Sequence, residues 1–112
     1  MQVLIERIRK FIRERDWEQF HSPKNLVMAL SVEIAEIMEH FQWLTIEESR
    51  KLSPAKMAEV KDEIGDVLVY LIRLCDELGI DPIKAANDKM LKNAEKYPIE
   101  KAKGSAKKYT EL

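Results

Sequence analysis

The sequence predicts an all-α fold, a four-helix-bundle-like arrangement with two long antiparallel helices that assembles as an oligomer. Three observations support this. Apolar residues recur at helical spacing along most of the chain. Three prolines each follow a residue that commonly caps a helix. No segment shows the alternation of a strand. The 112 residues, 46% of them hydrophobic, suffice for one domain with a packed core.

The first two expected helices occupy the N-terminal part of the chain. Residues 2–15 carry apolar positions at helical spacing, which predicts one amphipathic helix. Ser22 followed by Pro23 is an N-cap with proline at the first helical position, and the long helix that begins there should run to about Phe41. The stripe of the first helix consists of Val3, Leu4, Ile8, Phe11 and Ile12.

The later helices are marked by similar signals. Thr45 followed by Glu48 three residues on is a possible capping box, which predicts one short connecting helix. Ser53-Pro54 begins a second long helix, and Gly79 should end it. Asp81-Pro82 begins a last helix by the same combination of cap and proline.

The last helix should reach about Lys96, since Pro98 cannot continue it. We therefore expect one helical domain over residues 1–98. Residues 99–112 form a lysine-rich C-terminal tail, which we expect to be loosely structured.

The first long helix, residues 23–41, is apolar on nearly all of its faces. A helix of this kind must be buried on most sides, and a single bundle of 112 residues has few such places. We therefore expect a homo-oligomer in which this helix packs against a partner chain. One side carries Leu26, Leu30, Ile34, Ile37 and Phe41, and the other carries Met28, Val32 and Ala35.

Charge and cysteine content exclude several classes of protein. With 19 basic and 20 acidic residues, the chain lacks the basic excess of nucleic-acid-binding proteins. No apolar run approaches the roughly 18 residues of a membrane span. A single cysteine, Cys75, excludes a disulfide framework and favours a reducing compartment. We expect a soluble, cytoplasmic protein with neither nucleic-acid nor membrane partners.

Two acidic pairs, one on each long helix, are the strongest functional signal. Glu33 and Glu36 stand three residues apart on the first, and Glu63 and Asp66 stand three apart on the second. This spacing puts the carboxylates of a pair side by side on one helix face. Most such pairs are solvated, but these lie in mostly apolar stretches with few bases nearby. Four like charges in that setting need a positive partner.

Four carboxylates offer hard oxygen ligands, which Mg²⁺ or Mn²⁺ prefers. A di-iron site is the alternative, but it needs Glu-x-x-His on two helices. His40 lies four residues after Glu36, and the second long helix has no histidine. Mg²⁺, with Mn²⁺ as a possible substitute, is therefore the predicted cofactor, and it points to phosphate chemistry. For His40 we expect a hydrogen bond to Glu36, and for His21 a surface position beside the helix cap.

The two acidic motifs together resemble the metal motif of the MazG-like superfamily of all-α nucleoside triphosphate pyrophosphohydrolases. The similarity is greatest to its dCTP pyrophosphatase branch. At one position the chain departs from that branch, since a histidine that touches the base aligns with Ile8, and we expect weaker base discrimination as a result. The similar segments are Arg15-Asp16-Trp17-Glu18-Gln19-Phe20-His21, Phe41-Gln42-Trp43 and Lys108-Tyr109-Thr110-Glu111-Leu112.

The resemblance implies that the protein hydrolyses a nucleoside triphosphate to the monophosphate and pyrophosphate, as house-cleaning of dCTP or modified dCTP. It implies that Glu33, Glu36, Glu63 and Asp66 bind magnesium, and that the protein is a homotetramer formed as a dimer of dimers. The implied substrate-binding residues are Trp17 and Trp43 in the base pocket, Tyr70 near the nucleotide, and Lys89 and Asn93 on the phosphate side.

Several alternatives stay open at this point. The same chemistry could act on dUTP or an oxidised purine triphosphate, or the chain could be a non-catalytic, metal-stabilised oligomerisation module. Trp17 and Trp43 could be half-buried packing residues. One of the four acids could act as the general base, and Glu36 is our candidate.

Overall fold

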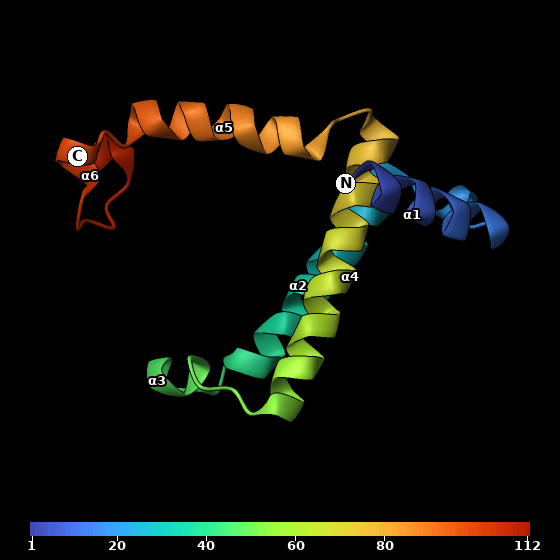
Figure 1. The fold of residues 1–112 in the computed structure, drawn as a ribbon, viewed down its shortest axis with the longest axis horizontal. Coiled ribbons are helices and arrows are strands. Elements are labelled where there is room, and N and C mark those ends of the chain that lie inside the picture. The colour runs from blue at the N-terminus through green and yellow to red at the C-terminus, as the bar shows by residue number, and fades with distance from the viewer. The chain divides into compact units, whose positions relative to one another are not determined.

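The computed structural model describes all residues, 1–112, and contains helices and no strand, which confirms the all-α prediction (Figure 1). Its contacts divide the chain into two compact units, Met1–Gly79 and Ile80–Leu112. The division expected at residue 98 falls within the second unit. In order, the elements are α1 (Gln2–Glu14), η1 (Glu18–Phe20), α2 (Pro23–Phe41), α3 (Ile46–Ser49), α4 (Pro54–Leu78), α5 (Pro82–Lys96), α6 (Ile99–Ala102) and η2 (Tyr109–Glu111).

The predicted helix starts are confirmed by side-chain caps. The hydroxyls of Ser22 and Ser53 each accept a hydrogen bond from the backbone N–H three residues on, and the Asp81 carboxylate caps α5 in the same way. Thr45 and Glu48 form the predicted reciprocal capping box around α3. Pro23, Pro54 and Pro82 follow the caps of α2, α4 and α5. Because proline has no backbone N–H, it leaves no donor unsatisfied at the first position of a helix.

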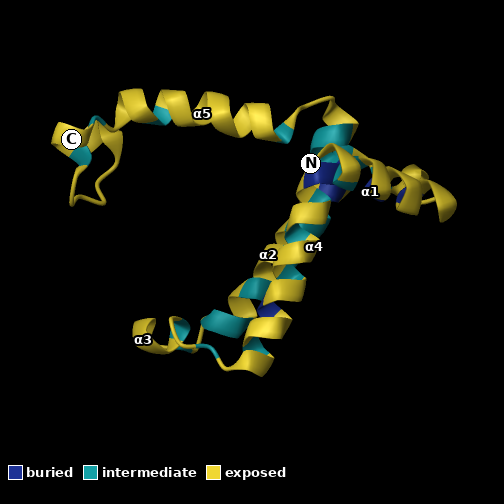
Figure 2. Ribbon diagram, viewed as in Figure 1, coloured by how far each residue is buried: buried dark blue, intermediate teal, exposed yellow.

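In the first unit, α2 and α4 lie side by side and antiparallel, joined through α3, and α1 crosses the C-terminal part of α4 (Figure 1). The core is small. Ile8 and Ile12 of α1 pack with Ile72 of α4, and Leu26 and Val60 are the other buried apolar residues. Figure 2 shows how few residues are buried in the hairpin. The α2–α4 pair is therefore secured mainly near its two ends.

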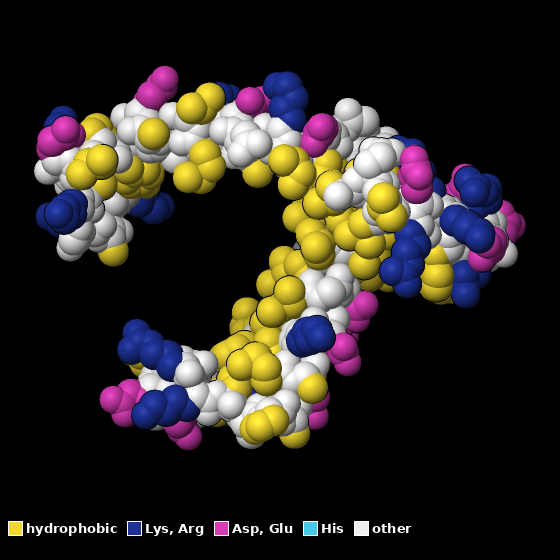
Figure 3. All heavy atoms as spheres, viewed as in Figure 1, with side chains coloured by type: hydrophobic (Ala, Val, Ile, Leu, Met, Phe, Trp, Pro, Cys, Tyr) yellow, Lys and Arg dark blue, Asp and Glu magenta, His cyan; other side chains and the backbone are white.

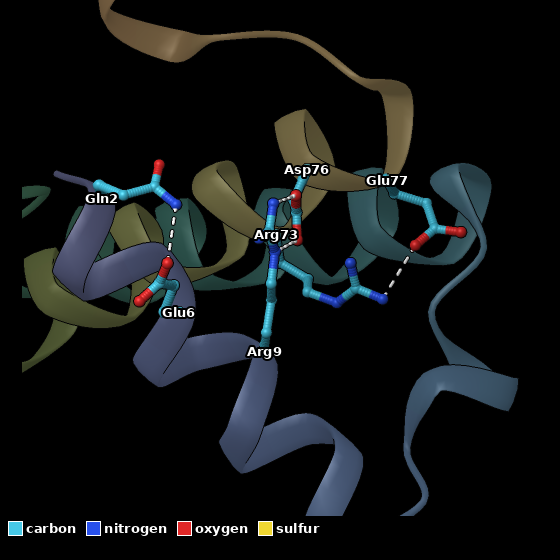
Figure 4. A network of polar contacts seen from close by, with 6 residues as sticks. All are labelled: Gln2, Glu6, Arg9, Arg73, Asp76 and Glu77. Atoms are coloured by element: carbon cyan, nitrogen blue, oxygen red, sulfur yellow. Dashed lines mark hydrogen bonds and ion pairs between the residues drawn. The ribbon is translucent and has the colours of Figure 1, made fainter.

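A bidentate ion pair ties α1 to α4. Arg9 Nε and Nη2 donate to the two carboxylate oxygens of Asp76 at 2.8 and 2.6 Å (Figure 4). The hydrogen bond from Arg9 lowers the pKa of Asp76 below its ordinary value of 3.8. Two parallel hydrogen bonds fix the angle between the groups, so the pair adds to the packing of Ile8 and Ile12 on Ile72 in holding α1 across α4.

The C-terminal unit corrects one prediction. The tail expected to be loosely structured forms α6 and η2. The ring of Tyr109 meets that of Tyr97 edge to face at 6.1 Å, and Lys96 Nζ lies 4.8 Å from the centre of the Tyr109 ring. Pro98 does stop α5, but these aromatic and cation–π contacts then order the chain beyond it.

Much of the α2–α4 hairpin is apolar and exposed. Figure 3 shows apolar side chains along one side of the hairpin and acidic ones along the opposite edge. On α2 only Leu26 is fully buried. The expectation that this helix packs against a partner chain stays a prediction. None of the helices combines the length and apolar character that crossing a bilayer requires. The exposed apolar residues include Val27, Met28, Val32, Ile34 and Met38 of α2 and Met57, Ile64, Leu68, Val69 and Leu71 of α4.

Candidate metal and nucleotide site

The hairpin brings the acids of α2 and α4 together. The pKa of Glu33 is raised above its ordinary value of 4.5, first by burial of its carboxyl and then by its contact with Glu36. The negative charges of Glu36, Asp66 and Glu63 raise it further. All three other acids thus act on Glu33, as the spacing of the two motifs led us to expect.

Two buried carboxylate oxygens in this cluster form no hydrogen bond, and Glu33 Oε2 has no charged partner either. Glu33 Oε2 and Glu63 Oε2 are the buried side-chain oxygen or nitrogen atoms left without a hydrogen-bond partner in the whole chain. An unsatisfied buried carboxylate oxygen is costly, so a native protein has a reason to keep it. Four carboxylates offer only oxygen ligands, and some of these oxygens form no hydrogen bond within the chain. Such a group fits a hard divalent cation such as Mg²⁺.

The four acids are neighbours, but their carboxylates do not converge on a common position for a metal ion. No three His, Cys, Asp or Glu side chains form a ready-made metal site. Mutual repulsion accounts for this, since carboxylates that share a low-dielectric space move apart unless a cation stands between them.

His40 contacts a different acid from the one expected. Its Nε2 lies 2.6 Å from Glu63 Oε2 on α4, so the predicted hydrogen bond to Glu36 is wrong. The two atoms are close enough for an ion pair but are not aligned as a hydrogen bond, which leaves Glu63 Oε2 without a partner. On its other side, His40 Nδ1 lies 3.2 Å from Lys56 Nζ. The residue faces the neighbouring helix, a contact that spacing along α2 alone does not indicate.

The two tryptophans flank α2. Trp17 precedes it, is 42% exposed, and its indole meets the ring of Phe11 edge to face at 5.8 Å. Trp43 follows α2 and is 85% exposed. A helix of 19 residues is about 28 Å long, so these two side chains of one chain lie at opposite ends of α2. Tyr70 is half-buried on α4, one turn beyond Asp66, and so lies on the face of the acids.

His21 is not the surface histidine that its position beside the cap suggested. It is half-buried, and its Nδ1 accepts a hydrogen bond from Arg73 Nε at 3.2 Å. Arg73 is 7% exposed and also pairs with Glu77 (Figure 4). Sequence reasoning missed this pair because 52 positions separate its members.

The two predicted phosphate-side residues belong to the second unit. Lys89 and Asn93 stand four residues apart on α5 and therefore share a face of that helix. Lys89 is exposed and Asn93 is half-buried. The charge of Lys96 is the main cause of a lowered pKa at Lys89, and Lys92 adds to it. This face of α5 thus concentrates positive charge, which suits a phosphate.

Comparison with known proteins gives consistent matches. The model of the MazG-like family matches residues 28–112. The chain is 43% identical over 105 residues to the dCTP pyrophosphatase 1 of Bos taurus and 44% identical to that of Homo sapiens. Each match covers 92% of this chain but 62% of the relative. A solved pyrophosphatase from Archaeoglobus fulgidus is 43% identical with a TM-score of 0.84, over 88% of this chain and 92% of that one. The resemblance predicted from the motifs is confirmed.

Replacing Glu33 by glutamine should stabilise the metal-free protein, because the amide removes a charge that burial and three acids oppose. The raised pKa means that folding binds a proton here, so the penalty is present at neutral pH and disappears as the pH falls below 4.5. Thermal melting in EDTA should show a higher Tm for Glu33→Gln than for wild type at neutral pH, and no difference below pH 4.5.

The same variant should lose its response to metal. Mg²⁺ should raise the Tm of the wild type by binding the native state and should leave Glu33→Gln almost unchanged. Glu39→Gln, at an exposed position of the same helix, is the matched control and should behave as wild type. A Glu33→Gln protein with unaltered Tm in EDTA and a normal Mg²⁺ response would contradict the site.

Proposed function

The chain belongs to the MazG-like family, and on that basis we propose that it is a Mg²⁺-dependent nucleoside triphosphate pyrophosphohydrolase that removes dCTP or modified dCTP. The observation that carries the proposal is the gathering of four acids between α2 and α4, where the buried Glu33 Oε2 has no partner. The similarity to two dCTP pyrophosphatases and to an archaeal pyrophosphatase supports the reaction class. Because the chain spans 62% of the length of the curated relatives, the substrate is part of the proposal.

Glu33, Glu36, Glu63 and Asp66 would hold Mg²⁺, or Mn²⁺ in its place. When bound, such an ion neutralises triphosphate charge and makes water more acidic. The contact from His40 restrains Glu63 from the outside, so the carboxylate has fewer orientations to lose when it becomes a ligand.

The remaining chemistry falls to the chain's own residues. The water oxygen attacks the α-phosphorus, the bond to the bridging oxygen breaks, and pyrophosphate leaves with that oxygen. Glu36 is the candidate general base that accepts the proton of the water. Tyr70, on the face of the acids, would contact the sugar. Lys89 and Asn93 supply a positive charge and an amide for the phosphates.

The base pocket requires more than one chain. Stacking on an indole face binds any base, and we assign it to Trp17 and Trp43. They lie at opposite ends of a helix about 28 Å long, so a single base cannot touch both tryptophans of one chain. We therefore propose a homo-oligomer, a tetramer built as a dimer of dimers, in which Trp43 of one copy completes the pocket that holds Trp17 of another. The exposed apolar side of the α2–α4 hairpin is the surface that such packing would cover.

Pyrophosphate release from a panel of nucleotides tests the function. With Mg²⁺, the wild type should act best on dCTP or 5-methyl-dCTP, and Glu63→Gln should lose most turnover while its circular dichroism stays helical. The exposed Glu39→Gln serves again as the matched control. Preference for dUTP or an oxidised purine triphosphate would reassign the substrate. No release from any nucleotide would leave a metal-stabilised assembly module as the function.

Removal of either tryptophan should weaken nucleotide binding more than the chemical step. Base stacking is worth about 1–3 kcal/mol, so Trp17→Ala and Trp43→Ala should each raise KM roughly 5- to 150-fold with kcat little changed. Wild-type KM for both variants on the best substrate would make the tryptophans packing residues.

Co-expression of the two variants tests the shared pocket. If one copy supplies Trp17 and another Trp43, random mixing leaves about a quarter of the pockets with both tryptophans, and a fraction with wild-type KM should reappear. A pocket within one chain would give no such recovery. Light scattering that shows an active monomer at micromolar concentration would also overturn the assembly.

A further inference from the structure

Glu63 is the one acid of the cluster that lies within ion-pair distance of a histidine, and that histidine in turn contacts a lysine. His40, near the end of α2, places its Nε2 2.6 Å from Glu63 Oε2. On the other side of the ring, His40 Nδ1 lies 3.2 Å from the Nζ of Lys56, in the first turn of α4. The side chains of His40 and Glu63 are 14% and 23% exposed, so their contact is largely shielded from water.

The lysine decides which ring nitrogen of His40 carries the proton. An ammonium group has three donors and no acceptor, so Lys56 Nζ donates and His40 Nδ1 accepts with its lone pair. Glu59 Oε2 lies 3.7 Å from the same ring nitrogen, but it is closer to Lys56 Nζ, at 3.2 Å, and pairs with the lysine. The proton of the neutral ring therefore resides on Nε2, the nitrogen that faces Glu63.

The carboxylate at the end of this row forms no hydrogen bond in the metal-free chain. His40 Nε2 is close to Glu63 Oε2, but the two groups are not aligned as donor and acceptor. A neutral N–H at this place can orient the carboxylate without cancelling its charge, whereas a lysine or arginine there would compete with a cation. Outer partners of metal ligands typically change metal affinity by about 10–100-fold.

We propose that Lys56 and His40 are positioning residues of the metal site: Lys56 fixes His40 as an Nε2–H donor, and His40 orients Glu63 as a ligand. The inference rests on the proposed function and adds to it an outer shell that begins at Lys56. The four acids supply the oxygens, and this row of side chains sets how tightly Glu63 binds a cation. Lys56 acts only through His40, since it pairs with none of the four acids.

Substitutions at the two positions separate the donor from the ring and from the lysine. His40→Gln keeps an amide N–H near the place of Nε2, whereas His40→Leu has a side chain without a donor. Lys56→Met keeps an apolar stem and removes the ammonium. Lys61→Met, at an exposed position of the same helix, is the matched control. Mn²⁺ alone is titrated into the nucleotide-free protein, and the free ion is measured by electron paramagnetic resonance.

His40→Leu should weaken Mn²⁺ binding roughly 10- to 100-fold, and His40→Gln should recover most of that loss. Lys56→Met should weaken it roughly 2- to 12-fold, the effect of one hydrogen bond of about 0.5–1.5 kcal/mol, and Lys61→Met should bind as the wild type does. At mildly alkaline pH, nitrogen-15 NMR of the metal-free protein should find the His40 proton on Nε2 in the wild type and partly on Nδ1 in Lys56→Met. A merely structural contact would lower the Tm in EDTA and leave the Mn²⁺ affinity unchanged.

Three results would overturn the inference: wild-type Mn²⁺ affinity in His40→Leu, binding in His40→Gln as weak as in His40→Leu, or a wild-type His40 proton on Nδ1. Each can occur while pyrophosphate release is normal, which would leave the proposed function standing. Conversely, a chain that binds Mn²⁺ with the expected dependence on His40 and Lys56 but releases no pyrophosphate would lose the proposed reaction and keep this outer shell.

Discussion

Repulsion among the carboxylates on facing sides of α2 and α4 is the constraint on which the rest of this structure depends. Two helices that carry Glu33 and Glu63 toward each other gain little from that part of their contact. The hairpin must therefore be secured elsewhere. Ile72 packs with α1 at one end, and Val60 is buried toward the other. The middle is left electrostatically unsatisfied, which is the condition in which a cation binds most strongly.

The basic side chains are likewise paired away from the middle of the hairpin. Arg9 and Arg73, the two arginines with well-formed ion pairs on α4, are matched to Asp76 and Glu77 near its C-terminal end, away from the acids. Lys56 reaches the cluster only through His40. No arginine or lysine is paired with the four acids, so their charge is not already neutralised by the chain. That distribution supports the proposed cation-binding role as much as the acids themselves do.

The helices could be predicted from signals between residues that are close in sequence. The contacts between helices could not be predicted in this way. A serine followed by proline identified the start of α2 and of α4 because a cap is formed by residues that adjoin in sequence. The acidic pairs were found for the same reason, since a spacing of three is a property of one helix. His40 was assigned to the wrong acid because its partner lies on the opposite helix. The contact between Tyr97 and Tyr109 was missed because it depends on how the chain turns after α5.

The hydrogen bond from Arg73 to His21 shows the same limit from another side. In the sequence Arg73 is one charged residue near the end of a long helix. Its partner His21 belongs to the loop between α1 and α2, in which Asp16 adopts the left-handed conformation at a φ of 53°. A charge pattern can show that an arginine is available, but only packing shows which acceptor it reaches.

The small core has a thermodynamic consequence. The core of a single chain consists of five buried apolar side chains, while most of the apolar surface of α2 and α4 faces water. Whatever covers that surface adds its binding free energy to the folded state through mass action. The stability of this fold is then no fixed property of the sequence. In the proposed oligomer, stability would rise with the concentration of the chain, and dilution would join heat and denaturant as a means of unfolding the protein.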